Sequence, residues 1–178
     1  SSVCKILKEN GYDIISNGVL FREIAEEKGI TVVELNELAK KDKSIDDMLD
    51  ERSIRLGKEL DSTIFDSRMG WHFIPDSFKV FLLADMTEAG RRVYNDNRVS
   101  ESYNDPATAK ADLIKRQLME KKRFSDLYQT DYLNLNNYDL VIESTYATPD
   151  QIAEQILKGV EEKVMSQAKL NPKSLYPA

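Results

Sequence analysis

The sequence has little of what builds metal or disulfide frameworks. Cys4 and His72 are its only cysteine and its only histidine. A single cysteine excludes a disulfide scaffold and a cysteine-rich metal site, and a single histidine leaves no Cys/His cluster for a zinc enzyme. No apolar run approaches the roughly 18 residues of a membrane span. No basic stretch followed by an apolar one opens the chain as a signal peptide would.

The composition is instead that of a folded globular protein. Of its 178 residues, 41% are hydrophobic and 31% are charged, and acidic residues outnumber basic ones by 31 to 25. The length fits one domain that can bury about 70% of the surface of its unfolded chain. The acidic balance argues against a general nucleic-acid-binding protein, although it leaves a local basic cleft as an alternative. We therefore expect a cytoplasmic protein with no nucleic acid and no membrane among its partners.

Short apolar runs alternate with segments that carry helix signals. The runs are residues 12–16, 62–66, 79–84 and 138–143, and they read as strands buried on both faces. Such alternation predicts an α/β fold, a three-layer parallel sheet with helices on both faces. The helices are expected near 1–10, 19–28, 31–38, 44–56, 87–95, 107–128 and 148–167.

The segments between these elements are polar or irregular. Residues 67–77 read as an irregular stretch, and residues 95–106 read as a mobile polar loop flanked by arginines, which resembles a lid. Residues 168–178 are rich in turn formers and read as a C-terminal tail or linker. We therefore expect one domain over residues 1–167.

Ligands of parallel α/β sheets bind at the carboxyl ends of the strands. The first run is followed by Ser16 and Gly18, and Arg22 comes one helical turn later. Glycine permits a close backbone approach, the following helix N-terminus favours an anion, and arginine can hold a phosphate in a bidentate manner. The alternative is an ordinary strand-to-helix turn with a solvated arginine.

The second run ends at Asp66, and Arg68 follows two residues later. A carboxylate and a guanidinium at this position can hold a metal-bound phosphate and a second phosphate oxygen. The alternative is a surface salt bridge, which contributes under about 1 kcal/mol. The position at the carboxyl edge of the sheet favours the functional interpretation.

A long predicted helix carries two arginines and a glutamate on one face. Arg116, Glu120 and Arg123 are spaced i, i+4 and i+7. Two arginines can clamp a transferring phosphoryl group while the carboxylate orients them. An ordinary solvated charged face is the alternative interpretation.

Taken in order, these motifs resemble those of one enzyme family. Their order resembles that of the cytidylate kinase-like branch of the P-loop nucleoside monophosphate kinases. The resemblance extends over nearly the whole chain, to about residue 162. The motifs are Ser16-Asn17-Gly18, Phe21-Arg22-Glu23, Ile45-Asp46, Asp50-Glu51-Arg52, Asp66-Ser67-Arg68 with Gly70-Trp71, the Arg116–Glu120–Arg123 set, and Tyr138-Asp139-Leu140-Val141-Ile142.

The resemblance implies a phosphotransferase with a P-loop kinase fold. Such an enzyme moves the γ-phosphoryl group of ATP to a nucleoside monophosphate with Mg2+, with CMP or dCMP as the default acceptor, and is expected to be a monomer or a weak homodimer. The lid would cover about residues 91–123. The implied site residues are Arg92, Arg116, Arg123 and Asp66 for catalysis, Ser16, Gly18, Phe21, Arg22, Arg68, Gly70 and Glu120 for the monophosphate, Ser1 and Ser2 for ATP, and Ser1 and Asp66 for the metal.

The first residues carry a further expectation. The family opens with a strand and a Gly-rich loop that ends in Gly-Lys-Ser/Thr, and the segment 1–4 is similar to the residues immediately after that lysine. Because the lysine and the loop amides cradle the phosphates, we expect the printed chain not to be a competent kinase. We also expect its strands not to form one continuous ladder, because the strand before the phosphate loop lies in the middle of such a sheet.

Departures from the family pattern leave other functions open. Ala89 stands where a second lid arginine is common, Val19 where an acid often follows the first motif, and Ser67 where glycine commonly precedes the phosphate-binding arginine. One alternative is the same fold acting on another small acceptor. The other is a non-catalytic nucleotide-binding or scaffolding module.

Overall fold

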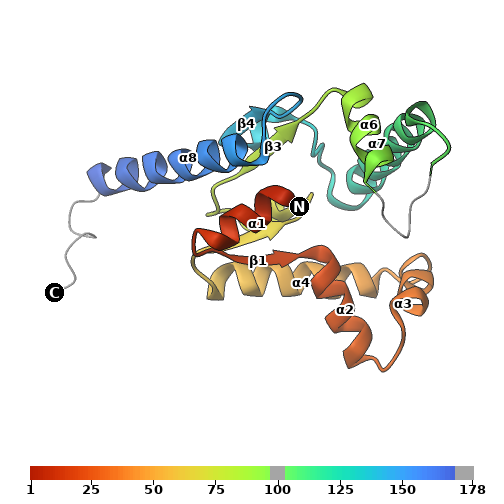
Figure 1. Ribbon diagram of the computed structural model, residues 1–178. Helices are drawn as coiled ribbons and strands as arrows, with labels where there is room; N and C mark the ends of the chain where they lie inside the picture. Colours follow the sequence, from red (N-terminus) through yellow and green to blue (C-terminus); the bar gives the residue numbers. More distant parts are fainter. Residues whose placement is uncertain (97–102, 171–178) are drawn as a thin grey trace. The chain divides into compact units, whose positions relative to one another are not determined.

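The computed structural model describes residues 1–96 and 103–170, and the chain divides into two compact units (Figure 1). The first unit is Ser1–Ser77 and the second begins at Phe78. Each unit combines several helices with one pair of parallel strands. The architecture is therefore mixed α/β with parallel strands, as the alternation of the sequence predicts.

The first unit is built around one strand pair. Strand β1 is parallel to β2, and Ser16 at the end of the first lies opposite Asp66 at the end of the second. The elements in order are α1 (Ser2–Glu9), β1 (Asp13–Ser16), α2 (Asn17–Glu27), α3 (Val32–Ala39), α4 (Ser44–Glu59), β2 (Thr63–Asp66) and α5 (Gly70–Phe73).

The second unit contains the other strand pair. Strand β3 is parallel to β4, with Leu83 opposite Glu143 at their carboxyl ends. The elements in order are β3 (Val80–Leu83), α6 (Met86–Asn95), α7 (Pro106–Tyr128), the 3-10 helix η1 (Leu135–Asn137), β4 (Leu140–Glu143) and α8 (Pro149–Leu170). The predicted loop 95–106 lies partly outside the described residues, because it includes 97–102.

Side-chain caps fix where several helices begin. Helix α3 begins with a capping box: Thr31 Oγ1 accepts from the Glu34 amide, and Glu34 Oε2 accepts from the Thr31 amide. A second reciprocal pair precedes α8, where Thr148 Oγ1 accepts from the Gln151 amide at 3.2 Å and Gln151 Oε1 accepts from the Thr148 amide at 2.9 Å. These caps satisfy backbone donors that have no partner inside the helix.

Helices α2, α3 and α4 share a hydrophobic core of their own. Ile24 and Ala25 of α2, Leu35 of α3 and Ile45 of α4 are at most 2% exposed. Phe21 packs against this cluster from the first turns of α2. The packing holds the amino end of α2, which follows β1 directly, in a defined position.

The strands lie where the sequence predicts them, within about two residues at each end. Their predicted burial on both faces is wrong. Ile142 of β4 is 2% exposed, whereas the adjacent Val141 is 38% exposed, and Leu82 and Leu83 of β3 are 42% and 41% exposed. Successive strand residues point to opposite faces, so in β4 this alternation marks a strand that is covered on one face.

Within the irregular stretch 67–77, the structure contains the short helix α5.

The four strands form two separate pairs rather than one ladder. In the part of the chain that is described, β1 pairs with β2 and β3 pairs with β4, and no hydrogen bonds join β2 to β3. The strands therefore do not form one continuous ladder within the described residues, as expected. The predicted three-layer sheet with helices on both faces is not confirmed by these pairs, because each strand has one neighbour within residues 1–96 and 103–170.

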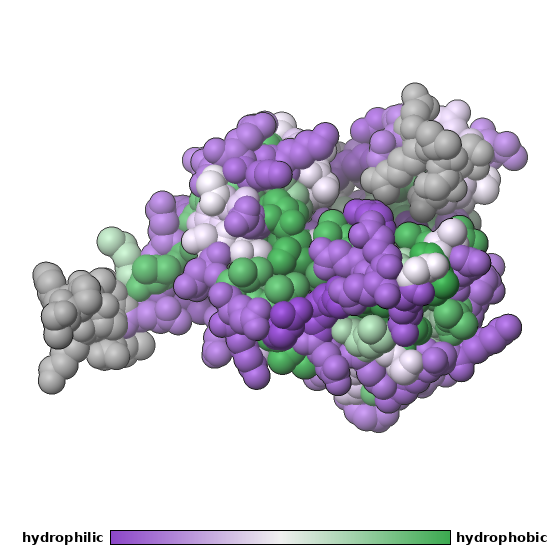
Figure 2. All heavy atoms as spheres, turned by 90° about the horizontal axis from the view of Figure 1, so that it is seen from below, coloured by the Kyte–Doolittle hydropathy of each residue, from purple (hydrophilic) through white to green (hydrophobic). Residues whose placement is uncertain are grey.

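Apolar residues reach the surface between hydrophilic ones (Figure 2). The exposed apolar side chains include Leu118 and Met119 of α7, at 62% and 63%, and Met165 of α8, at 68%. None of the helices in the described ranges is both long enough and apolar enough to span a membrane.

Candidate functional site

The carboxyl ends of β1 and β2 bring two predicted site residues together. Ser16 and Asp66 are register partners on these adjacent parallel strands. Ligands of parallel sheets bind at this edge, so both residues lie where the sequence analysis expects a ligand, and their roles stay predictions. Asp66 is exposed and Ser16 is half-buried.

Gly18 and Arg22 lie beside Ser16 at the beginning of α2. The Ser16 Oγ atom caps the helix by accepting from the Val19 amide at 3.3 Å. A Cβ atom built on Gly18 would lie 3.8 Å from both Arg22 Nη1 and Ser16 Oγ. The hydroxyl and the guanidinium thus approach the same exposed glycine, where helix amides and a positive charge both favour an anion.

Asp66 also lies close to the first helix. The Ser1 amino nitrogen lies 3.9 Å from Asp66 Oδ2, and the Cys4 thiol donates to the same oxygen at 3.7 Å. Ser1 Oγ in turn donates to Cys4 Sγ at 3.0 Å and accepts from the Cys4 amide. Ser1 and Asp66, the predicted metal ligands, are therefore neighbours, while Ser2 opens α1 and is exposed.

The segment after Asp66 turns directly into α5. Ser67 Oγ accepts from the Met69 amide at 3.2 Å, Arg68 is exposed, and Gly70 begins the helix. The prediction that Arg22 and Arg68 serve one phosphate site stays a prediction, although both follow strands that pair with each other. Phe21 packs against the core of α2–α4, which by itself accounts for an apolar residue there.

The other predicted residues belong to the second unit. Arg116, Glu120 and Arg123 all lie on α7, where the spacing predicts one shared face. Arg116 and Glu120 are half-buried, and Arg123 is exposed. Their predicted roles in the transfer stay predictions.

Arg92 has a well-defined set of partners. Its Nε donates to Glu88 Oε1 at 3.0 Å, and its Nη2 donates to the backbone carbonyls of Ser144, at 3.0 Å, and of Thr145. Arg91 donates to both carboxylate oxygens of Glu88. The guanidinium of Arg91, and then that of Arg92, lower the pKa of Glu88 to about 2 despite a smaller opposing effect of burial.

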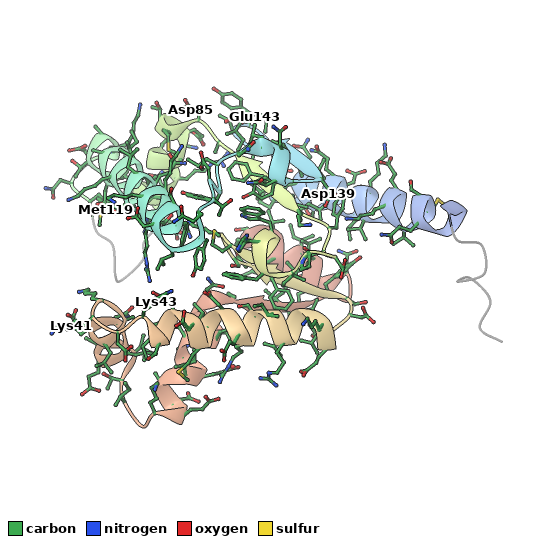
Figure 3. The ribbon with its side chains drawn as sticks, turned by 180° about the vertical axis from the view of Figure 1, so that it is seen from behind. Lys41, Lys43, Asp85, Met119, Asp139 and Glu143 are labelled. Carbon is green, nitrogen blue, oxygen red and sulfur yellow. The ribbon has the colours of Figure 1, made fainter. Side chains whose placement is uncertain are left out.

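A polar network occupies the carboxyl ends of β3 and β4, where Asp85 and Glu143 lie at the same edge (Figure 3). The Asp85 amide donates to Thr145 Oγ1 at 2.8 Å, and this hydroxyl donates to Glu143 Oε1, which also accepts from the Thr145 amide. These two hydrogen bonds from Thr145 lower the pKa of Glu143. Backbone amides of α6, from Glu88 and then Thr87, lower the pKa of Asp85.

Sequence reasoning did not single out this second network. Ser144 and Thr145 are each only 5% exposed, which is unusual for polar residues in a connecting segment. A signal was present, because Asp85 directly follows the third predicted strand and Glu143 ends the fourth, at the edge where ligands were expected. The partners themselves were not predictable, since Arg92 and Ser144 are 52 residues apart.

The oxygen ligands that Ser1 and Asp66 offer at the end of β2 fit Mg2+. This ion takes hard oxygen ligands, commonly one or two carboxylates together with substrate phosphates. The Asp66 carboxylate and the Ser1 hydroxyl are such oxygens. Among residues 1–96 and 103–170, no group of three or more His, Cys, Asp or Glu side chains could hold a metal by itself.

Comparisons with known proteins point to one family. Residues 1–146 match the model of the cytidylate kinase-like family. A protein named cytidylate kinase from Sulfolobus acidocaldarius is 32% identical over 172 residues, which cover 94% of this chain and 91% of that protein. Another of the same name, from Methanobrevibacter smithii, is 31% identical over 158 residues, which cover 88% and 89%.

A solved structure shares the fold. An uncharacterized protein from Eubacterium ventriosum superposes with a TM-score of 0.66 at 19% identity, over 89% of both chains. The family match over most of the chain and the similarity to full-length relatives agree with each other. The chain therefore belongs to the cytidylate kinase-like family.

Proposed function

We propose that the protein is a nucleoside monophosphate kinase that transfers the γ-phosphoryl group of ATP to CMP or dCMP. Membership of the cytidylate kinase-like family supports a kinase of this general kind. The observation that carries the proposal is the paired carboxyl ends of β1 and β2, where Ser16 faces Asp66 and Arg22 approaches Gly18.

In this proposal, the acceptor phosphate is held by Arg22 and Arg68. Both side chains are exposed and follow paired strands, so they are accessible to a ligand at this edge. Two guanidiniums provide the charge and the donor geometry that a phosphate requires. The monophosphate site also includes Ser16, Gly18, Phe21 and Gly70.

Helix α7 supplies the groups that act on the transferred phosphoryl group. Arg116 and Arg123 stabilise the negative charge on its equatorial oxygens, and Glu120 orients them. The transferred group has a loose transition state, so the contribution of the protein is mainly positioning and electrostatic stabilisation.

ATP and Mg2+ are assigned to the first residues and Asp66. Ser1 and Ser2 lie at the amino end of α1, where helix amides favour phosphate oxygens. Ser1 Oγ and the Asp66 carboxylate would hold the metal. When bound, Mg2+ neutralises charge on the phosphates and helps to orient them. The protein residues bind the phosphates and exclude water.

The proposal includes a wider architecture. The kinase domain covers residues 1–167 as a three-layer P-loop sheet, with a lid near residues 91–123, and residues 168–178 form a tail. The enzyme acts in the cytoplasm as a monomer or a weak homodimer.

Phosphoryl transfer can be measured directly as ADP formation. The protein, expressed from its complete gene, is assayed with ATP, Mg2+ and each of CMP, dCMP, UMP, AMP and GMP. We expect CMP or dCMP to have the highest kcat/KM. Preference for a purine monophosphate would contradict the proposed acceptor, and no transfer to any of them would contradict the proposed reaction.

The role of Arg68 gives a sharper test. We expect Arg68→Ala to lower kcat/KM by about 2–4 kcal/mol of transition-state binding, because an electrostatic contact to the phosphate is lost. Arg55→Ala is the matched control, since Arg55 is an exposed arginine of α4 that pairs with Glu59 at 3.7 Å. Equal kcat/KM values for Arg68→Ala and wild type would refute the role.

A further inference from the structure

Arg92 connects the middle of α6 to the segment that follows β4. Its Nη2 atom donates to the carbonyl oxygens of Ser144 and Thr145, which lie more than 50 residues further along the chain. Its Nε donates to Glu88 on the same helix. The family resemblance implies an arginine that faces the transferred phosphoryl group, yet these donors point at backbone and at a carboxylate of the protein itself.

We propose that Arg92 is a positioning residue that fastens the end of β4 to α6, rather than a residue that contacts the transferred group. The expected effect of Arg92 on turnover rests on the proposed function above. The attachment of the segment after β4 to α6 does not depend on that function. The proposal follows from the partners of the guanidinium and from the buried state of the segment that it holds.

The chemistry of the contact requires arginine. A guanidinium has five N–H donors in a fixed plane, so one side chain can serve Glu88 and two carbonyl oxygens at the same time. Ser144 and Thr145 are each 5% exposed, so their carbonyls have little access to water. A buried carbonyl without a donor is costly, and Arg92 supplies donors to both.

A second connection joins the same two parts. The Asp85 amide, at the beginning of α6, donates to Thr145 Oγ1 at 2.8 Å. Asp85 Oδ1 also caps α6 by accepting from the amides of Thr87 and Glu88. The segment after β4 is therefore held at two places, at the N-cap residue Asp85 and about two turns further along α6 at Arg92.

The segment that is held in this way is at the carboxyl edge of β3–β4. The Ser144 amide donates to the Leu83 carbonyl at 2.7 Å, so it continues the pairing of the two strands. Tyr146 follows immediately and is 92% exposed. Arg92 thus sets the position of the residues that this edge presents to a ligand.

Arg91 provides a natural comparison. It is the next residue of α6 and donates to both oxygens of Glu88, at 2.8 and 2.7 Å. Its bonds to Glu88 are local, spanning three residues, whereas those of Arg92 reach the segment after β4. Substitutions at the two positions remove the same charge beside the same glutamate, so a difference between them isolates the contact to the segment.

Hydrogen exchange tests the fastening without any nucleotide. The amides of Asp85 and Ser144 are followed in wild type, Arg92→Gln, Arg92→Lys and Arg91→Gln. We expect both amides to exchange about tenfold faster in Arg92→Gln and within about twofold of wild type in Arg91→Gln. The exchange rates in Arg92→Lys should be intermediate, since an ammonium group cannot reproduce the planar set of guanidinium donors. This variant replaces Arg92→Gln in the test if the latter does not fold. Wild-type exchange rates in the Arg92 variants overturn the proposal.

Kinetics separate positioning from contact with the reacting group. In the transfer assay, we expect Arg92→Gln to raise KM for a nucleotide about fivefold or more, with kcat changed by less than about threefold. A kcat loss of about a hundredfold at unchanged KM would mark a group that acts in the transition state and would also overturn the proposal. If wild type shows no transfer, the proposed function fails, and the exchange rates still decide the role of Arg92.

Discussion

Glu88 accepts hydrogen bonds from two consecutive arginines of α6. The guanidiniums of Arg91 and then Arg92 lower its pKa from 4.5 to about 2. A carboxylate whose pKa is lowered in the folded protein stabilises the fold above its unfolded pKa, and this contribution disappears as the pH falls through the folded value. The stabilisation is therefore complete above about pH 4.5 and is lost progressively towards pH 2.

Glu88→Gln tests this dependence. We expect the free energy of unfolding of the variant to fall less steeply than that of wild type between pH 4.5 and 2. Glutamine carries no titratable charge, so it removes this one contribution and leaves those of the other carboxylates. Denaturant unfolding at a series of pH values measures the difference. Parallel profiles for the two proteins would show that Glu88 does not contribute.

Among the residues whose exposure the structure describes, Tyr146 is the most exposed large apolar or aromatic side chain, at 92%. It follows a segment whose backbone is held by Arg92 and by the pairing of Ser144 with Leu83. An exposed aromatic ring on a rigid backbone offers a face on which a nucleobase can stack at low entropic cost.

We expect Tyr146→Ala to weaken nucleotide binding by about 1–3 kcal/mol, the usual contribution of base stacking on an aromatic ring. Tyr146→Phe, which keeps the ring, should bind as wild type. Titration calorimetry with ATP and with CMP measures both variants. Unchanged affinity of Tyr146→Ala for both nucleotides rules out the stacking role.

Helices α6 and α7 cross at a glycine. Gly90 is buried, and a Cβ atom there would lie 2.7 Å from Lys110 Cβ and 2.9 Å from its Cα and backbone nitrogen. Backbone atoms of a helix cannot move aside as the end of a side chain can. Close packing of the two helices therefore depends on the absence of a side chain at this position.

Gly90→Ala should lower the free energy of unfolding by about 1–3 kcal/mol, because overpacking exceeds the gain in helix propensity. Gly159→Ala is the matched comparison within α8, where the added Cβ would meet the far end of the Phe78 ring at 2.7 Å. We expect a smaller loss there, since the ring can shift. Thermal unfolding distinguishes the two, and a more stable Gly90→Ala variant would contradict the packing argument.

Local chemistry explains which elements could be predicted. The capping boxes at Thr31 and Thr148 are short-range features of the sequence, and both form in the structure. Helix α5 was missed because one turn of four residues leaves no apolar period to detect. Burial of the strands was overestimated because an apolar run does not reveal how many neighbours a strand will find.

In the candidate site, too, features with a local signal could be predicted and long-range contacts could not. That Ser16 and Asp66 lie at the same sheet edge follows from a general rule about parallel strands and could be predicted, whereas their direct pairing could not. The contacts of Arg92 with Ser144 and Thr145 could not, because they join positions that are distant in the sequence and depend on how α6 is rotated. Long-range hydrogen bonds from surface helices to strand ends have no local signature.

The stability of the whole chain should also change at alkaline pH. Burial, and then the charges of Tyr132 and Asp131, raise the pKa of Tyr138 from 10.0 to about 12. Its hydroxyl donates to the Tyr132 carbonyl at 2.7 Å. A group whose pKa is raised in the folded state stabilises the fold below its unfolded pKa, and the contribution is lost as the pH rises through the folded value.

We therefore expect the free energy of unfolding to fall between pH 10 and 12 by more in wild type than in Tyr138→Phe. The variant keeps a ring against Phe81, whose centroid lies 4.9 Å from that of Tyr138. Below pH 10, the free energy of unfolding of the variant should be lower than that of wild type by a constant amount, which corresponds to the lost hydrogen bond. Identical alkaline slopes would show that Tyr138 does not contribute.

The parallel pairing within each unit has a consequence for how fast the protein folds. Asp13 pairs with Thr63 and Val80 with Leu140, so each strand pair closes a loop of 50 or 60 residues. Closing such loops costs entropy before any strand contact is gained, whereas capped helices form from neighbouring residues. Refolding after rapid dilution from urea should thus show helical signal before the pairs form, and substitutions in β1 or β3 should slow refolding more than they accelerate unfolding.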